Sequence, residues 1–161
     1  MKIVIGIDVG ISTTKIIGIN EEGRVLSPIR IKATDPVTSL YGAFGKYLYD
    51  NKIQLGDVEK VMLTGVGAAY IDKAVYGLPT GKSEEFIANG LGARYETGLE
   101  RMMVVSMGTG TSIVKCDHDE ISHLGGIGIG GGTLQGLSRL LLNTDDIKSL
   151  RGMRNLKTVG L

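Results

Sequence analysis

The stretch that decides the fold is KIVIGIDVGISTTK, residues 2–15. Residues 2–8 are β-branched and apolar with almost no polar interruption, which is typical of a strand buried in the centre of a sheet. The strand ends at Asp8, and a glycine turn follows at Gly10. Residues 13–20 predict a second strand, so the turn joins the two strands of a hairpin.

The chemistry of this first turn is that of a phosphate site. Backbone N–H groups at a glycine turn can hold phosphate oxygens, and the Ser and Thr side chains add donors. Lys15 either contacts the phosphate or is an ordinary lysine on the exposed face of the strand. Asp8 at the strand end could hold a hydrated Mg²⁺, because that ion prefers carboxylate and water ligands. The Walker A spacing is absent, and an ordinary hairpin with a glycine turn explains the local pattern about equally well.

The first hundred residues predict a mixed sheet with a helical crossover. A helix opens at Asp35-Pro36, because Asp is a favoured N-cap and Pro fits the first helical position. The other expected elements are strands over 24–33 and 58–64 and a helix over 84–98. The first three strands form an antiparallel meander, and the strand–helix–strand order that follows implies a right-handed crossover.

A second block begins near residue 100 and repeats the opening pattern. Strands over 102–107 and 111–116 flank Gly108-Thr109-Gly110, and a glycine run at 125–132 leads into a helix with leucines at helical spacing. Two similar hairpins, one opening each half, indicate a molecule of two related lobes. The second half is too short to complete a copy of the first.

Two glycine segments of this block are candidate anion sites. Taken alone, SMGTGTS at 106–112 is a weak signal for a phosphate site, because any Gly-Thr turn would look similar. Together with the first turn the signal is stronger, because two such turns facing each other would clamp one polyphosphate. The run GGIGIGGGTLQGL at 125–137 precedes a helix, whose N-terminus attracts anions through its dipole and its free N–H groups. It does not follow the first strand of a βαβ unit, so we reject a dinucleotide fold. A merely flexible loop is the alternative.

Few other side chains point to chemistry. Glu84-Glu85 opens the helix over 84–98, where a carboxylate near a cleft could take the proton of a substrate hydroxyl, although acidic residues also simply complement a helix dipole. His118 and His123 are too isolated for a metal pair, and we expect Cys116 to be buried and inert.

Composition excludes several classes of protein. Of the 161 residues, 42% are hydrophobic, and the net charge of +1 argues against a nucleic-acid surface. One cysteine rules out an internal disulfide framework. There is no signal-peptide layout and no apolar stretch long enough to span a membrane, so a soluble cytoplasmic protein is expected.

Taken together, GIDVGISTTK, EEF (84–86), MGTGTS and GGIGIGGGTLQGLSRLL resemble the type II pantothenate kinases of the actin, sugar-kinase and Hsp70-like ATPase superfamily. The resemblance implies an α/β fold of two ribonuclease-H-like (actin-like ATPase) lobes with ATP between them. It places the first lobe at 1–99 and the beginning of an incomplete second lobe at 100–161. It also implies a homodimer that transfers the γ-phosphate of ATP to pantothenate, the first step of coenzyme A biosynthesis.

The resemblance also implies roles for individual positions. Asp8 would lie beside Mg²⁺, and Glu85 would be the general base, with Glu84 its replacement if the alignment slips by one. His123 and Gly125 would lie at the pantothenate. The ATP contacts would be Gly10, Ile11, Ser12, Thr13, Thr14, Lys15, Thr109, Gly131, Gly132, Thr133, Leu134 and Gln135.

Three departures weaken the match. Ile11 replaces a second glycine of the first loop, and His123 replaces an Arg that binds the pantothenate carboxylate, which a neutral His cannot match with permanent, bidentate charge. The family also continues well beyond the length of this chain. The alternatives are a superfamily ATPase, such as the activators of acyl-CoA dehydratases, and a nucleotide-sensing module without turnover. The activators need two cysteines per subunit for an iron–sulfur cluster, and this chain has one.

Overall fold

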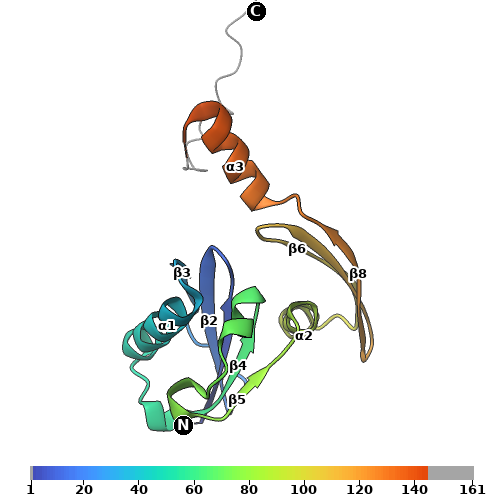
Figure 1. Ribbon diagram of the computed structural model, residues 1–161. Helices are drawn as coiled ribbons and strands as arrows, with labels where there is room; N and C mark the ends of the chain where they lie inside the picture. Colours follow the sequence, from blue (N-terminus) through green and yellow to red (C-terminus); the bar gives the residue numbers. More distant parts are fainter. Residues whose placement is uncertain (1, 145–161) are drawn as a thin grey trace, which may run out of the picture. The chain divides into compact units, whose positions relative to one another are not determined.

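The computed structural model describes residues 2–144, which divide into two compact units after Gly92 (Figure 1). The first unit contains a five-stranded sheet with the strand order β3-β2-β1-β4-β5, and the second contains a three-stranded sheet with the order β6-β7-β8. The comparisons reported below confirm the predicted α/β fold class.

The first sheet is mixed, as predicted. Strands β1, β2 and β3 form an antiparallel meander, whereas β4 runs parallel to β1 and β5 runs parallel to β4. The strands are β1 (Ile3–Val9), β2 (Thr13–Asn20), β3 (Ile29–Lys32), β4 (Val58–Thr64) and β5 (Thr80–Lys82). β3 is shorter than the predicted 24–33, because near its start only Val25 forms an isolated bridge to Ile19. β5 was not predicted, because its three residues, TGK, carry no apolar pattern.

The core of this unit lies between the sheet and helix α1 (Pro36–Asn51). The helix begins where predicted, and its Thr38 N–H donates to the carboxylate of Asp35 at 2.7 Å. Alternation along β1 turns every second side chain towards α1, where Leu40, Phe44 and Tyr47 are fully buried. Each such side chain contributes roughly 1.5–3 kcal/mol by leaving water. The short 3₁₀ helices η1 (Leu55–Asp57), η2 (Val66–Tyr70) and η3 (Val75–Gly77) complete the unit.

Helix α2 (Glu85–Thr97) confirms the predicted helix over 84–98. The sequence also predicts that this helix turns Phe86, Ala88, Leu91, Gly92 and Tyr95 inward, but Leu91 and Tyr95 are 52% and 55% exposed. Glycines interrupt the apolar spacing, so the helix has no continuous apolar stripe, and Gly90 is its one buried residue.

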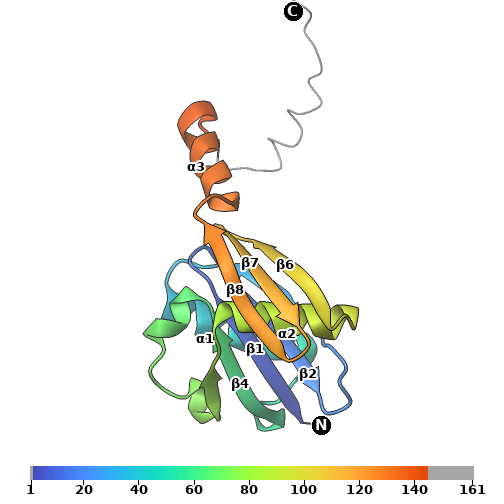
Figure 2. The same ribbon diagram turned by 90° about the vertical axis from the view of Figure 1, so that its right-hand side faces the viewer.

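The second unit is an antiparallel sheet followed by a helix (Figure 2). Its elements are β6 (Arg101–Met107), β7 (Thr111–Asp117), β8 (Glu120–Ile127) and α3 (Gly131–Leu142). Cys116 is buried as predicted. The sequence does not predict strand β8, because Gly125-Gly126 belongs to a glycine run that is typical of a loop. A register shift occurs beside this pair, and the φ of +146° at Gly125 favours glycine.

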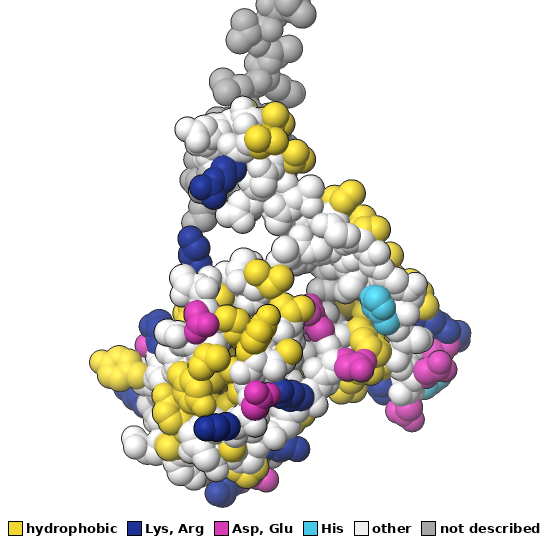
Figure 3. Space-filling view, viewed as in Figure 1, with side chains coloured by type: hydrophobic (Ala, Val, Ile, Leu, Met, Phe, Trp, Pro, Cys, Tyr) yellow, Lys and Arg dark blue, Asp and Glu magenta, His cyan; other side chains and the backbone are white. Residues whose placement is uncertain are grey.

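The leucines of α3 are exposed, although their helical spacing was predicted correctly. Leu134, Leu137, Leu140 and Leu141 are 50–79% exposed, and Figure 3 shows hydrophobic side chains at the surface of this helix. The sequence Thr144-Asp145-Asp146 also predicts the cap of one more short helix, and that helix falls outside the described residues. Among residues 2–144, no helix is long and apolar enough to cross a membrane.

Candidate functional site

The first turn is closed by its own backbone. The Gly10 N–H donates to the Thr13 carbonyl at 3.1 Å, and a Cβ on Gly10 would lie only 2.7 Å from that oxygen. Ile11 and Ser12 are exposed at the tip. The turn therefore requires glycine at position 10 and presents its tip to solvent.

Asp8, Lys15 and Thr64 form one row across three neighbouring strands. Asp8 pairs with Lys15 on β2 and with Thr64 on β4, so the three side chains lie on the same face of the sheet. Lys15 Nζ lies 2.7 Å from Asp8 Oδ2. Thr14 has the opposite orientation and is fully buried, so a phosphate at the turn could contact only its backbone.

A second glycine pair, Gly65 and Gly67, packs against the first turn, and its role is not predictable from the sequence. Gly65 has a φ of +84°, and a Cβ there would overlap Asp8 Oδ1. A Cβ on Gly67 would lie 2.7 Å from the Val9 carbonyl oxygen. Its signal in the sequence is the Gly-Val-Gly at 65–67 that follows β4, a pattern that by itself predicts only the end of the strand.

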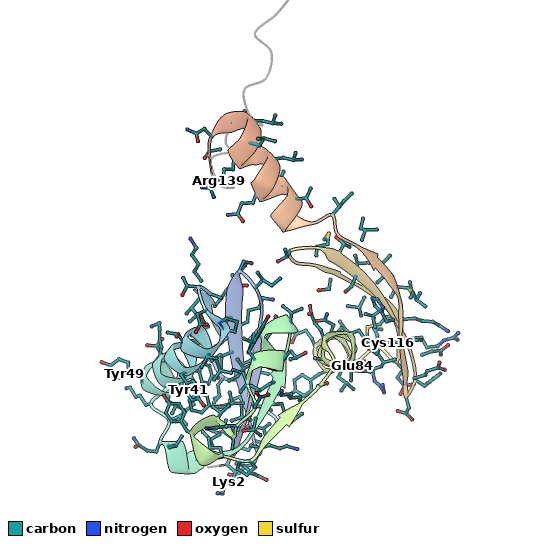
Figure 4. The ribbon with its side chains drawn as sticks, viewed as in Figure 1. Lys2, Tyr41, Tyr49, Glu84, Cys116 and Arg139 are labelled. Carbon is teal, nitrogen blue, oxygen red and sulfur yellow. The ribbon has the colours of Figure 1, made fainter. Side chains whose placement is uncertain are left out.

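A cavity of about 530 Å³ opens on the face of the first sheet that carries this row. Asp8, Lys15 and Thr64 line one part of it, together with Glu85 from the first turn of α2. Glu84 is not among the lining residues; Figure 4 labels it at the start of α2. The structure thus brings the first turn's charged residues and one of the two candidate bases to a single cavity within the first unit.

In the second unit, the second turn and the glycine run are bonded to each other. Gly131 N–H donates to the Gly108 carbonyl at 2.8 Å, and Gly132 N–H donates to the Thr109 carbonyl at 3.1 Å. The Thr111 hydroxyl donates to the Ile129 carbonyl at 2.8 Å. Two motifs that are separate in the sequence therefore form one structure.

This arrangement corrects one expectation. We expected free N–H groups at the start of α3, but those of Gly131 and Gly132 donate to carbonyls of the protein. The Thr133 hydroxyl likewise donates to the Gly128 carbonyl at 3.1 Å. Leu134 and Gln135 follow in the first turn of the helix and are exposed, as is Thr109.

The two histidines of the second unit have different surroundings. His123 is exposed on β8 opposite Val114, two residues before Gly125. His118 Nδ1 lies 2.9 Å from Glu100 Oε2 in a surface pair. Within residues 2–144, no three His, Cys, Asp or Glu side chains cluster as a metal site would require. A cation at Asp8 would therefore take most of its ligands from water and substrate.

Comparison with known proteins gives a consistent result. The Fumble family model matches residues 91–156. A type II pantothenate kinase from Bacillus anthracis is 31% identical over 158 residues, which cover 93% of this chain and 53% of that protein. The chain thus spans about half the length of the curated relatives it matches.

Solved structures show the fold. Component A of (R)-2-hydroxyglutaryl-CoA dehydratase from Acidaminococcus fermentans aligns with a TM-score of 0.78 at 14% identity, covering 100% of this chain and 61% of that one. The activator of 2-hydroxyisocaproyl-CoA dehydratase from Clostridium difficile, solved with bound ADPNP, gives 0.76 at 14% identity and covers 99% and 59%. The chain has an actin-like ATPase fold, and its predicted similarity to type II pantothenate kinases is confirmed.

Proposed function

We propose that this chain, which is similar to type II pantothenate kinases over most of its length, provides the phosphate turns and the acceptor base of an ATP-dependent kinase for pantothenate. The observation that carries the proposal is the cavity of the first unit. It places Glu85 and the Asp8–Lys15 pair around one space. Phosphoryl transfer depends on positioning and on charge stabilisation, and these are the groups that it uses.

In this proposal the first turn binds the phosphates of ATP. Its exposed tip offers backbone N–H groups, and Lys15 supplies a positive charge within reach of Asp8. One carboxylate suits Mg²⁺, which keeps several waters and takes further ligands from substrate phosphates. Asp8 would hold the ion, and the ion would neutralise charge on the transferred phosphoryl group.

The second unit would contribute the remaining nucleotide contacts. Thr109 and the segment Gly131–Gln135 are held together by hydrogen bonds, so both would approach the nucleotide as one rigid feature. His123 and Gly125 would meet the acceptor. His123 lacks the permanent charge of an arginine, so we expect weaker recognition of a carboxylate there. We further propose a cytoplasmic homodimer.

Glu85 is the proposed general base, because it lines the cavity and Glu84 does not. A purified chain incubated with Mg-ATP and pantothenate would form 4′-phosphopantothenate, detected by mass spectrometry. Glu85→Gln removes the proton acceptor without changing its size, and general-base loss typically costs 10²- to 10⁴-fold in rate. Glu84→Gln is the matched control and should retain turnover.

Three outcomes distinguish the alternatives. Loss of turnover in Glu84→Gln alone would transfer the role of base to Glu84. Full turnover by Glu85→Gln would remove the base from the proposal. ATP binding by calorimetry without turnover in the unaltered chain would instead favour a nucleotide-sensing module or a superfamily ATPase.

A further inference from the structure

Two buried polar atoms at the cavity of the first unit have no hydrogen-bond partner within residues 2–144. They are Thr64 Oγ1 and Asn89 Nδ2. Both residues line the cavity that contains Glu85. Most buried polar atoms in folded proteins have a partner. The other two exceptions within residues 2–144 lie in the core, on Thr14 and Tyr47, whereas Thr64 and Asn89 line one cavity that a ligand could enter.

The placement of Asn89 links it to the proposed base. Asn89 follows Glu85 by four residues on α2, so the two side chains lie on the same side of the helix, one turn apart. Thr64 lies at the end of β4 beside Asp8. A molecule whose hydroxyl reaches Glu85 would therefore occupy the same cavity as both unpaired atoms.

Most of the remaining cavity lining is apolar, although Arg30 and Ser83 also line it. Ile17 and Met62 pair with Gly6 on its two sides and form the row next to Asp8, and Pro28 and Ile29 extend the same surface. A sugar, with a hydroxyl on nearly every carbon, would leave polar groups unpaired against this surface. A ligand with a compact polar end and an aliphatic body fits both the polar residues around Glu85 and the apolar surface beside them.

We propose that Asn89 and Thr64 bind the acceptor substrate and select for its shape. The Asn89 amide donates to a carbonyl or hydroxyl oxygen of the acceptor, and the Thr64 hydroxyl pairs with a polar group beside it. The aliphatic body of the acceptor lies over Ile17 and Met62. This inference rests on the proposed function, because it takes the acceptor to occupy the cavity of Glu85.

Two variants of Asn89 test this role with pantothenate as the probe. Asn89→Leu removes the amide, and Asn89→Asp keeps its shape but replaces the donor with an acceptor. Both should weaken pantothenate binding at least about tenfold by calorimetry, the effect of one lost hydrogen bond in a buried site. ATP affinity should not change. All cavity residues lie between Gly6 and Asn89, so the measurement is made on the whole chain, which contains every one of them.

Thermal unfolding without ligand gives a second readout. An unpaired buried amide destabilises the free protein, so Asn89→Leu should keep or raise Tm. The control is Asn51→Leu. Asn51 Nδ2 donates to the Tyr47 carbonyl at 3.1 Å, so this variant should lower Tm but leave pantothenate affinity unchanged.

The outcomes separate the two proposals. If the unaltered chain binds pantothenate and both Asn89 variants bind it equally well, the role of Asn89 is overturned and the proposed function stands. If Asn89→Leu lowers Tm as Asn51→Leu does, the amide has a protein partner, and the inference is again overturned. If the unaltered chain binds no pantothenate, the proposed acceptor is wrong, and this inference is wrong with it.

Discussion

Lys15 Nζ lies 2.7 Å from Asp8 Oδ2, so the two charged residues that flank the first turn are joined across the hairpin. The pair is half open to solvent, with side-chain exposures of 52% for Lys15 and 23% for Asp8. A bound Mg-ATP would offer each of them a stronger partner, because phosphate oxygens attract the ammonium and the cation attracts the carboxylate. In the proposed kinase, the ion pair would keep both groups oriented until nucleotide binds.

Lys15→Met should separate the binding role of this lysine from its contribution to stability. Exposed ion pairs contribute about 0–1 kcal/mol, so the free energy of unfolding in urea should change little. Affinity for ATP should fall about tenfold or more, because a charge-assisted bond to phosphate is lost. Lys46→Met is the control, since Lys46 Nζ pairs with Asp50 at the same 2.7 Å away from the turn. Equal ATP affinity in both variants would contradict the phosphate role.

Gly65→Ala should disturb the first turn through Asp8. The variant places an L-residue at a φ of +84° and pushes a methyl group into the Asp8 carboxylate and the Val9 carbonyl. Gly77→Ala is the matched control, because Gly77 has a φ of +75° but a Cβ there would meet no atom within 4 Å. The conformational cost of roughly 1–2 kcal/mol is common to both. We expect Gly65→Ala to cost about 1–3 kcal/mol more, from overpacking. Equal losses in urea unfolding would show that the contact is unimportant.

Tyr47 makes stability depend on alkaline pH. Burial raises the pKa of its phenol above the usual value of 10.0, and the Gly18 backbone offsets part of this shift. The unfolded chain therefore loses this proton first. The contribution to stability is complete below pH 10 and is lost as the pH rises through the folded-state pKa. Tyr47→Phe should remove this loss, which urea unfolding at pH 8 and above pH 10 would detect. An unchanged pH dependence would exclude Tyr47 as its source.

Sequence patterns predicted elements where one physical signal dominated. The apolar run of β1, the Asp35 cap of α1 and the glycine turn at Gly10 each specify local structure, and each was found as expected. Strand β8 was missed because Gly125 and Gly126 carry no strand signal of their own. Their pairing with β7 is a tertiary effect that the local sequence does not report.

The individual residues of the candidate site were predictable from the sequence, but the contacts between them were not. GIDVGISTTK and EEF marked Asp8 and Glu85 separately, and only the register of β1 with β2 and β4 shows which side chains share a face. That the Asn89 amide has no partner among residues 2–144 could not be found from sequence, because pairing is a property of the packed structure. The hydrogen bonds that occupy the N–H groups of Gly131 and Gly132 are likewise tertiary.

The exposed leucines of α3 should drive association between copies. Leu140 and Leu141 are 79% and 72% exposed, and contiguous apolar surface of this kind marks interaction sites. Leu140→Glu with Leu141→Glu should shift sedimentation velocity profiles towards a monomer. Tyr49→Glu is the control, because Tyr49 is 85% exposed on α1 in the other unit. A monomeric unaltered chain, or equal effects of both variants, would contradict a role for α3.

Two glycines of α3 should respond to alanine in opposite directions. A Cβ on Gly132 would lie 2.7 Å from Thr109 Cγ2 and 3.0 Å from its carbonyl oxygen, so Gly132→Ala should separate the glycine run from the second turn. Gly136 lies one turn further along, where a Cβ would have nothing near it, and alanine there should stabilise the helix by about 0.5–1 kcal/mol. Amide hydrogen exchange across α3 would show faster exchange in Gly132→Ala and slower exchange in Gly136→Ala. If the second turn contacts ATP, only Gly132→Ala should also weaken nucleotide binding. Slower exchange in both variants would mean that the second turn moves to accommodate the methyl group at position 132. The close packing of Gly132 on Thr109 would then not be what holds the two motifs together.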